Sequence, residues 1–412
     1  MLLARATLRE PSSNFMPTPA RQRLVWPDVA RGVAILGLVI LHVSIDVPGG
    51  KDTFLAALNY YLGPIRLPLF FVISGYFGAK LLRFNLRDLI FRRLWFFAVP
   101  YAFFSLFEAR LKRNEILMKY PGLDPNDLDT LPHMAIAGDS IYWFLYCLVI
   151  CTCILWITRR LLAWLAMVAS FAPLGLLMVH EQSTPIVYNT MLFAPVFVAG
   201  ARIKPAITWL SEHTFRWTVI VPTVGLGALG FWMLTHGVWH TDSGLPYHDW
   251  AVWNYAADPL ASGLIGRLFS QLLIIPLAIA VARILSLVPA VARPLQFVGS
   301  HTLVIYLGHP LAMTFVFNTL FYRYDIYVLN RDNPDNPLLW SCICFVLCAA
   351  GSYFVWLWSK VPVLGWVVVP PQLLDGVAGL RERLGGRGSG GRFDKEAHDH
   401  QHADDSQRGP QG

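Results

Sequence analysis

The chain has 412 residues, of which 55% are hydrophobic and only 14% are charged. Soluble domains carry about 25% charged residues and cannot bury so much apolar surface, so the composition excludes a soluble enzyme or a soluble binding domain. The net charge of +7 does not indicate a nucleic-acid partner, because the basic residues follow the loop pattern of a membrane protein.

A membrane-spanning helix needs roughly 20 predominantly apolar residues. The sequence therefore predicts an all-α, polytopic membrane protein with about ten transmembrane helices in the lipid bilayer. The predicted spans, in chain order, cover residues 32–48, 56–80, 89–107, 140–158, 161–179, 186–203, 217–235, 264–286, 295–320 and 338–359. Arg92 and Arg93 interrupt the third span, and Pro64, Arg66 and Pro68 predict a kink or an unwound turn in the second.

Lys and Arg residues are unevenly divided between the two sides of this ten-span arrangement. A cytoplasmic start places 18 of them on inward segments, before the C-terminal tail is counted, and seven on outward loops. Cytoplasmic loops of membrane proteins carry such an excess of basic residues. The sequence therefore predicts that both termini are cytoplasmic and that the loops 108–139 and 236–263 face outward. The second loop is rich in Trp and His, which suits either sugar stacking or an interfacial aromatic belt.

The chain divides into four parts. These are a cytoplasmic segment (1–24), a ten-helix membrane domain (25–360), a proline-broken interfacial segment (361–384) and a disordered cytoplasmic tail (385–412). The first apolar run has no cleavage site after it, so we expect it to remain as the first helix. All six cysteines lie in apolar runs, which indicates small buried hydrophobic residues and predicts no metal site.

Ionisable residues inside membrane spans are costly, so each one is a functional candidate. In the first span, Arg31 and His42 are eleven residues apart, which places them within about 20° of each other on a helix. Asp28 and Asp46 extend the same stripe, and His42 lies near the membrane midplane, roughly 16 Å above Arg31. A neutral imidazole there suits a general base that takes a proton from a hydroxyl. The alternative is a structural histidine bonded to a neighbouring helix.

Two further charged or titratable groups lie in other spans. Arg66 must be paired or face a wet cavity. It can offset negative charge on an acyl carbonyl, orient an anionic ligand, or pair structurally with Asp46. His309 is a second midplane histidine, for which function and packing are equally open.

A basic cluster lies on the cytoplasmic side, close to Arg31. It consists of Lys80, Arg83, Arg87, Arg92 and Arg93. Such a cluster can hold the phosphates of a nucleotide-like donor, although the positive-inside rule alone also produces it. The sequence contains no Walker loop, dinucleotide fingerprint, nucleophile elbow or zinc-ligand spacing.

Together these segments resemble the acyltransferase-3 family of integral membrane O-acyltransferases, over roughly residues 24–360. The matching segments are Asp28 to Gly32 with His42, Arg66 to Tyr76, Arg92-Arg93 with Pro100 and Tyr101, Trp143-Phe144-Leu145, Phe197 to Arg202, and Gly299 to Pro310. Members often carry a histidine shortly before the Trp-Phe-Leu motif, where this chain has Asp139 to Tyr142. The contact is either lost or supplied by His133.

The resemblance implies transfer of an acetyl or succinyl group from cytoplasmic acetyl-CoA or succinyl-CoA to a hydroxyl of an extracytoplasmic glycan or glycolipid. It implies a location in the cell (inner or plasma) membrane and no tightly bound cofactor. Such an enzyme acts alone or with other envelope-biosynthesis proteins. We assign three sets of site residues: catalytic His42, Arg31 and Arg66; substrate-binding Asp28, Asp46, Ser74, Tyr76, Trp143, Tyr306 and His309; and donor-binding Arg83, Arg92 and Arg93.

Two other functions fit part of the pattern. A proton-coupled secondary transporter of a lipid or small anion also uses intramembrane His and Arg, but inverted repeats should then pair the interrupted second span with the seventh. The seventh span (217–235) carries no charge, which disfavours a transporter. A related group of multi-span transacylases shares the Asp-x-x-Arg-Gly entry to span one, but usually lacks a histidine at the position of His42.

Overall fold

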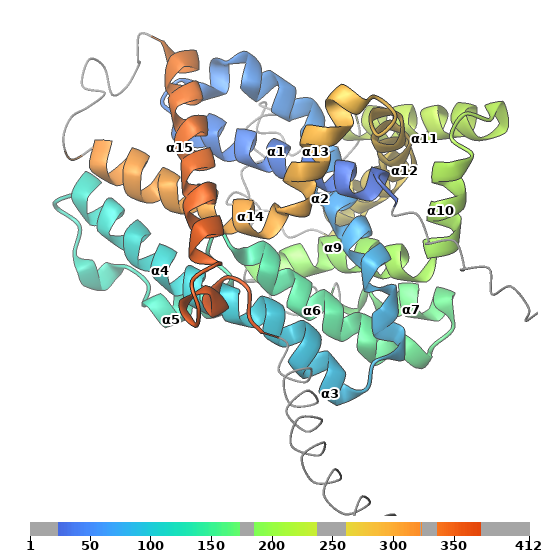
Figure 1. Cartoon of the computed structure of the whole chain (residues 1–412), viewed down its shortest axis with the longest axis horizontal. Helices are drawn as coiled ribbons and strands as arrows, with labels where there is room; N and C mark the ends of the chain where they lie inside the picture. The colour runs from blue at the N-terminus through green and yellow to red at the C-terminus, as the bar shows by residue number, and fades with distance from the viewer. Residues whose placement is uncertain (1–23, 174–184, 237–260, 322, 324–335, 372–412) are drawn as a thin grey trace, which may run out of the picture.

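A computed structural model of the chain describes residues 24–173, 185–236, 261–321, 323 and 336–371. Within these ranges the secondary structure is entirely helical (Figure 1). The α-helices are α1 (Trp26–Asp46), α2 (Phe54–Gly78), α3 (Leu86–Asp88), α4 (Trp95–Lys119), α5 (Leu131–Ala137), α6 (Trp143–Ile157), α7 (Ala163–Ala169), α9 (Pro185–Arg202), α10 (Lys204–Glu212), α11 (Trp217–His236), α12 (Ala261–Leu285), α13 (Pro289–Ser300), α14 (Thr302–Leu311) and α15 (Pro337–Trp358). Two π-helical segments, Leu89–Leu94 and Ala312–Phe321, adjoin α4 and α14.

Eight helices in the described part of the chain are long and apolar enough to cross a membrane, and a ninth counts if α9 and α10, bent by 75°, form one span. The predicted all-α polytopic fold is therefore confirmed. The predicted fifth span, 161–179, is represented by the seven-residue helix α7, and residues 174–184 fall outside the described ranges. The loop after α11, which was predicted to face outward, and the C-terminal tail from residue 372 also fall outside them.

The described helices differ from the predicted spans at three points. Arg92 and Arg93 do not break the third span, because a helix runs from Leu86 to Lys119, first through the π-helical segment and then through α4. The predicted outward loop 108–139 therefore begins with three further helical turns. Lys112 and Lys119 both pair with Glu115 at helical spacing, which stabilises this charged stretch as a helix.

The other two differences concern prolines and a helix break. The second span is helical throughout α2, so no turn is unwound, while the stretch that can cross the membrane begins at Ile65, directly after Pro64. The predicted ninth span begins at Thr302 rather than at 295, because His301 has a non-helical backbone that separates α13 from α14. The first eleven residues of the predicted interfacial segment contain a short 3₁₀ turn, Leu364–Val367.

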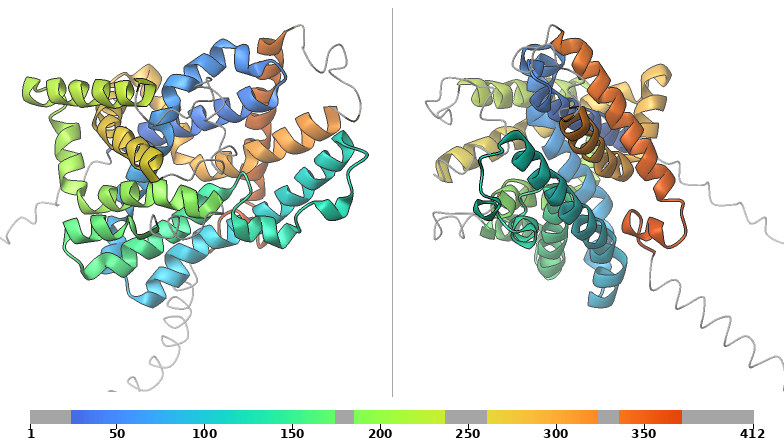
Figure 2. Two further views of the ribbon diagram at one scale, coloured as in Figure 1. Left: turned by 180° about the vertical axis from the view of Figure 1, so that it is seen from behind. Right: turned by 90° about the vertical axis from the view of Figure 1, so that its left-hand side faces the viewer.

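Helix α1 lies at the centre of the described helices and packs against α2, α12, α13 and α15 (Figures 1 and 2). Its crossing with α13 depends on two glycines. A Cβ at Gly32 would overlap the carbonyl oxygen of Leu295, and a Cβ at Gly299 would overlap that of Asp28. Small residues at such crossings let helix backbones approach closely. This contact fixes the N-terminal half of α1.

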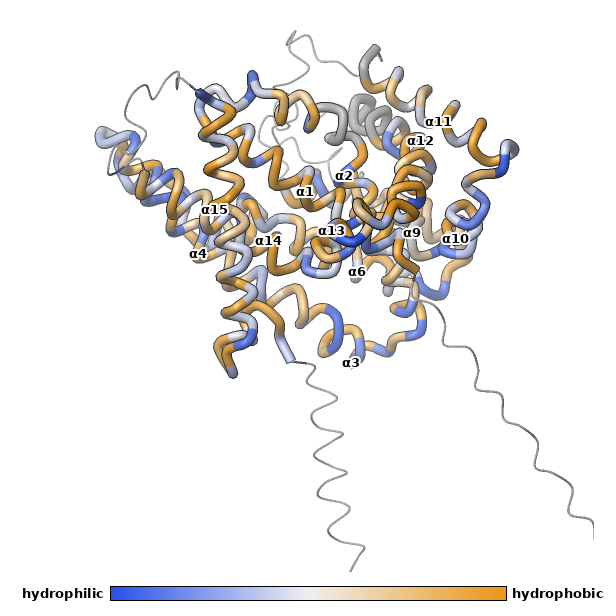
Figure 3. Tube along the Cα trace, turned by 45° about the horizontal axis from the view of Figure 1, so that its top comes forward, coloured by the Kyte–Doolittle hydropathy of each residue, from blue (hydrophilic) through white to orange (hydrophobic). Residues whose placement is uncertain are grey.

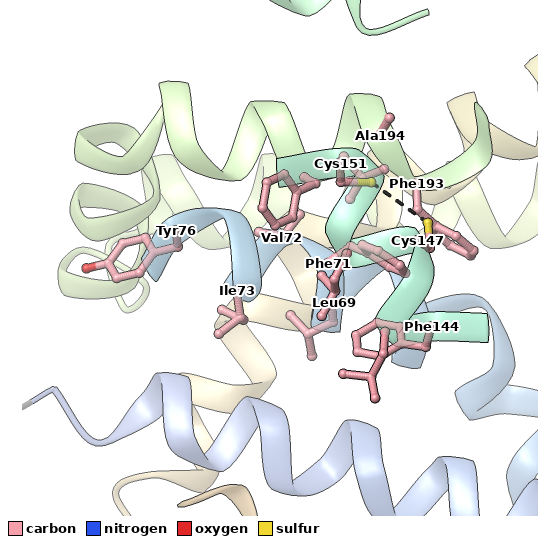
Figure 4. Close-up of a cluster of buried hydrophobic side chains, with 14 of the residues drawn as sticks. Leu69, Phe71, Val72, Ile73, Tyr76, Phe144, Cys147, Cys151, Phe193 and Ala194 are labelled. Atoms are coloured by element: carbon pink, nitrogen blue, oxygen red, sulfur yellow. Dashed lines mark hydrogen bonds between the residues drawn. The ribbon is translucent and has the colours of Figure 1, made fainter. Parts of the chain in front are cut away.

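Helices α2, α6 and α9 build an aromatic core beside α1 (Figure 4). Phe71 stacks on Phe193 at 4.5 Å between ring centroids, and Phe144 meets Phe71 edge-on at 4.8 Å. The Sγ atoms of Cys147 and Cys151 are 3.8 Å apart in the same core. All six cysteines are free thiols, and Cys342 on α15 is exposed rather than buried.

Candidate active site

The stripe predicted on α1 begins at the end that faces the basic cluster. The Arg31 Nη1 atom lies 3.6 Å from Oδ1 of buried Asp28. The guanidinium of Arg31 also stacks on the ring of Phe77, 4.3 Å from its centroid. Asp28 and Phe77 thus hold Arg31 between α1 and the end of α2, where its side chain keeps 25% of its surface exposed.

Three turns further along α1, two histidines from distant spans meet. The rings of His42 and His309 are 5.5 Å apart between centroids. His309 is fully buried, and its Nδ1 lies 2.8 Å from the Ile305 carbonyl oxygen. A carbonyl only accepts hydrogen bonds, so Nδ1 carries the proton and Nε2 is an acceptor. Nε2 has no hydrogen-bond partner among the described residues, and the ring of His42 is its neighbour.

Arg66 is buried, with 4% of its surface exposed, and Nη1 donates a hydrogen bond to Oδ1 of Asn59 on the same helix. Its charge acts on His42, so α2 places a cation close to the histidine pair. Asp46 accepts a hydrogen bond from Nδ2 of Asn318 at 3.0 Å. Sequence reasoning missed Asn59 and Asn318, although a polar side chain within an apolar span is the signal that finds such residues.

Three of the other assigned residues have surroundings that fit a supporting role. Tyr76 hydrogen-bonds to Oγ1 of Thr208 at 3.0 Å, and Nζ of Lys204 lies 4.4 Å from its ring. Ser74 is buried on α2. Trp143 stacks on Phe193 in the aromatic core, 6.0 Å between ring centroids.

Tyr306 stands closer to the histidines. Its ring is 6.2 Å from that of His309, and its hydroxyl donates to the Ile141 carbonyl at 2.9 Å and accepts from the Phe144 N–H at 3.3 Å. Tyr306 therefore holds α14 against the start of α6. Of the assigned residues, the structure thus brings His42, His309, Tyr306 and Arg66 together.

The basic cluster occupies the segment around α3, which forms a hydrophilic stretch in Figure 3. Arg83 and Arg92 are exposed, and Arg92 Nε lies 3.3 Å from Oδ1 of Asp88. Arg93 instead turns inward, with its guanidinium 4.5 Å from the Phe97 ring centroid and the charge of Arg31 acting on it. Its Nε is buried without a hydrogen-bond partner among the described residues. Two neighbouring guanidinium groups provide a complement for an anionic ligand.

His133 does not replace the family's missing histidine. It is exposed, and its Nδ1 lies 3.3 Å from Oδ1 of Asp129. Asp139, which stands in the corresponding segment, is half-buried, and its burial together with the nearby Asp129 charge raises its pKa.

An apolar cavity of about 360 Å³ lies between α1, α13, α14 and α15. Its lining includes Val39 and Ile305, each one helical turn from a histidine of the pair, as well as Phe297 and Trp356. The cavity therefore adjoins the histidines on their apolar side.

The model of one protein family, described as an acyltransferase domain, matches residues 24–357. No curated protein and no solved structure matches the chain. The match covers most of the chain, including α1 with its Arg31–His42 stripe and α14 with His309. The chain belongs to the acyltransferase-3 family, and it is a multi-pass membrane acyltransferase.

Proposed function

We propose that the protein transfers an acetyl or succinyl group from cytoplasmic acyl-CoA to a hydroxyl of an extracytoplasmic glycan or glycolipid, in the plasma membrane and with both termini in the cytoplasm. His42 is the general base. The observation that carries this proposal is the pairing of His42 with His309, whose buried Nε2 has no hydrogen-bond partner in the described structure.

The pair supports base catalysis because a second imidazole with an unoccupied acceptor nitrogen lies beside His42. In the proposed mechanism one nitrogen of His42 keeps its lone pair for the acceptor hydroxyl. That nitrogen takes the proton as the acceptor oxygen attacks the thioester carbonyl. The C–S bond then breaks, and the proton passes from His42 to the departing thiolate, which gives free CoA and the acyl ester. Arg66 is placed to stabilise the negative charge that develops on the carbonyl oxygen.

The opposite end of α1 supports binding of the donor. The charge of Arg31 acts on Arg93, and the exposed residues Arg83 and Arg92 belong to the same basic cluster. Guanidinium groups bind phosphate oxygens with charge-assisted hydrogen bonds. Phosphates held there are roughly 16 Å along the helix from His42, and the extended pantetheine arm of CoA spans that interval. The apolar cavity beside His42 fits the hydrocarbon tail of a glycolipid acceptor.

The test is transfer of label from radioactive acetyl-CoA or succinyl-CoA to glycolipids extracted from the cell envelope. His42→Ala should lower the transfer rate by about 10²–10⁴-fold, the usual contribution of a positioned base. His42→Asn keeps polarity and much of the size but cannot accept the proton, so it should be nearly as damaging.

His213→Asn is the matched control, because His213 lies after α10 and its Nδ1 bonds only to the neighbouring Trp209 carbonyl at 2.9 Å. It should leave the rate unchanged, and all variants should insert at normal abundance. A His42→Asn enzyme with most of the wild-type rate would make His42 a structural residue and would overturn the mechanism.

A further inference from the structure

A second polar group lies one helical turn beyond His42, at the end of α1 farther from the basic cluster. Asp46 is the last residue of α1, and Nδ2 of Asn318 donates to its Oδ2 at 3.0 Å. Asn318 belongs to the π-helical segment after α14, which packs against α4 and α15. Residues i and i+4 on a helix share a face, so Asp46 and His42 point in the same direction from α1.

Helix α4 packs against the π-helical segment that carries Asn318 (Figure 1). The charges of Lys112, Glu115 and Lys119 all act on Asp46. Glu108 lies one turn before Lys112 on this helix and interacts with Lys112 and Ser140. These residues fall in the stretch that sequence reasoning assigned to a loop.

The two buried glutamates of α4 differ in one decisive respect. Both oxygens of Glu115 are occupied, one by Lys112 at 3.1 Å and the other by Lys119 at 2.6 Å. Glu108 is 7% exposed, and its Oε2 atom has no hydrogen-bond partner among the described residues. A buried carboxylate oxygen without a partner is unfavourable and rare in folded proteins. Glu115 is therefore saturated by its own helix, whereas Glu108 is ready to accept a hydrogen bond from a ligand.

The chemistry of the group indicates the kind of ligand. Carboxylates (Asp46, Glu108), an amide (Asn318) and an ammonium group (Lys112) offer acceptors and donors together. Their charges nearly cancel when Glu115 and Lys119 are included, so the group favours neither a strong anion nor a cation. Such mixed sets bind neutral molecules that carry several hydroxyl groups.

We propose that Asp46, Glu108, Lys112 and Asn318 form the acceptor subsite, which binds the sugar hydroxyls of the glycan and presents one hydroxyl to His42. This inference rests on the proposed transfer reaction and adds its acceptor-binding residues. The donor phosphates and the acceptor sugar then approach the histidine pair from opposite ends of α1.

The experiment measures transfer of label from radioactive acetyl-CoA as the concentration of extracted envelope glycolipid is varied. Glu108→Gln replaces the acceptor oxygen by a donor, so the KM for glycolipid should rise about 10–100-fold, the range for a lost hydrogen bond to a charged group. The KM for acetyl-CoA and the slow hydrolysis of acetyl-CoA without glycolipid should not change. Glu212→Gln, at an exposed glutamate at the end of α10, should leave the KM for glycolipid at its wild-type value.

Asn318→Ala provides a second, independent variant if Glu108→Gln fails to fold, and it should raise the KM for glycolipid without affecting that for acetyl-CoA. An unchanged glycolipid KM in a folded Glu108→Gln or Asn318→Ala enzyme would overturn the acceptor subsite while leaving the proposed reaction intact. A wild-type protein that transfers no label from acetyl-CoA or succinyl-CoA would instead overturn the proposed reaction, and the subsite with it.

Discussion

Helices α1 and α11 are similar in length and are both apolar enough to cross a membrane, yet they occupy different environments. In the most apolar window of each helix, 61% of the residues of α1 are buried inside the protein, compared with 22% for α11. Helix α1 packs against four other helices, whereas α11 packs mainly against α12 at one edge of the helices (Figure 2). Hydropathy identifies both helices as spans but does not distinguish the central one from the peripheral one.

The distribution of ionisable residues does distinguish them. Helix α1 carries Asp28, Arg31, His42 and Asp46, while α11 contains no Asp, Glu, Lys or Arg. A charged group is tolerated in a membrane only where protein or water satisfies it. An ionisable stripe therefore indicates a helix that faces the protein interior. This difference can be tested with matched substitutions in the two helices.

The largest effect is expected at the glycines of the two helices. Gly32→Leu in α1 would force a side chain into the backbone of α13 at Leu295, whereas Gly225 in α11 has open space around it. Overpacking of this kind costs about 1–3 kcal/mol or more where the backbone cannot move. We expect little folded Gly32→Leu protein after detergent extraction, measured by size-exclusion chromatography.

Gly225→Leu is the control, and it should give at least as much folded protein as the wild type, because leucine favours a helix more than glycine by somewhat less than 1 kcal/mol. Equal yields of the two variants would show that the α1–α13 crossing is not the tight contact described above.

An intermediate effect is expected in the basic cluster that adjoins α1. Arg93 lies beside Arg31, while Arg92 is exposed and paired with Asp88. Arg93→Ala should raise the KM for acyl-CoA about tenfold or more, because it removes a partly buried charged donor. Arg92→Ala should raise it about fivefold or less, the range expected for an exposed charge. If abundance and activity instead fell together in both variants, the arginines would serve only to orient the helices in the membrane.

The histidine pair shows how far the sequence alone leads. His42 and His309 each stand out as ionisable residues in apolar spans, so both were predicted as candidates. Their contact was not predictable from periodicity, because the sequence pattern of a span does not determine which other helices it packs against. The π-helical segment that follows α14 was not predictable from the sequence either. This segment places Asn318 within hydrogen-bonding distance of Asp46.

Glu108 and Trp143 show two limits of prediction from sequence. The hydropathy pattern assigned Glu108 to a loop. Charged residues lower the mean hydropathy of a stretch of sequence, whether or not they form ion pairs along a helix. The structure places it on α4, one turn before the ion pairs of Glu115. Trp143 was assigned to substrate because it belongs to a family motif, yet it stacks in the aromatic core. A motif indicates that a residue matters but does not separate packing from contact with substrate.

The smallest effect is expected on the outer face of α11, where Trp232 is 58% exposed. Trp26 of α1 is the matched residue, with 2% of its surface exposed and its ring 5.8 Å from that of Tyr76. Trp26→Ala empties a buried site, so it should destabilise the fold and lower the thermal unfolding temperature more than Trp232→Ala does. Trp232→Ala removes a largely exposed ring, so the transfer rate and the unfolding temperature should both stay close to those of the wild type. If Trp232→Ala abolished transfer in a folded protein, the outer face of α11 would contact the acceptor or a partner protein, and the contrast between a central and a peripheral helix would fail.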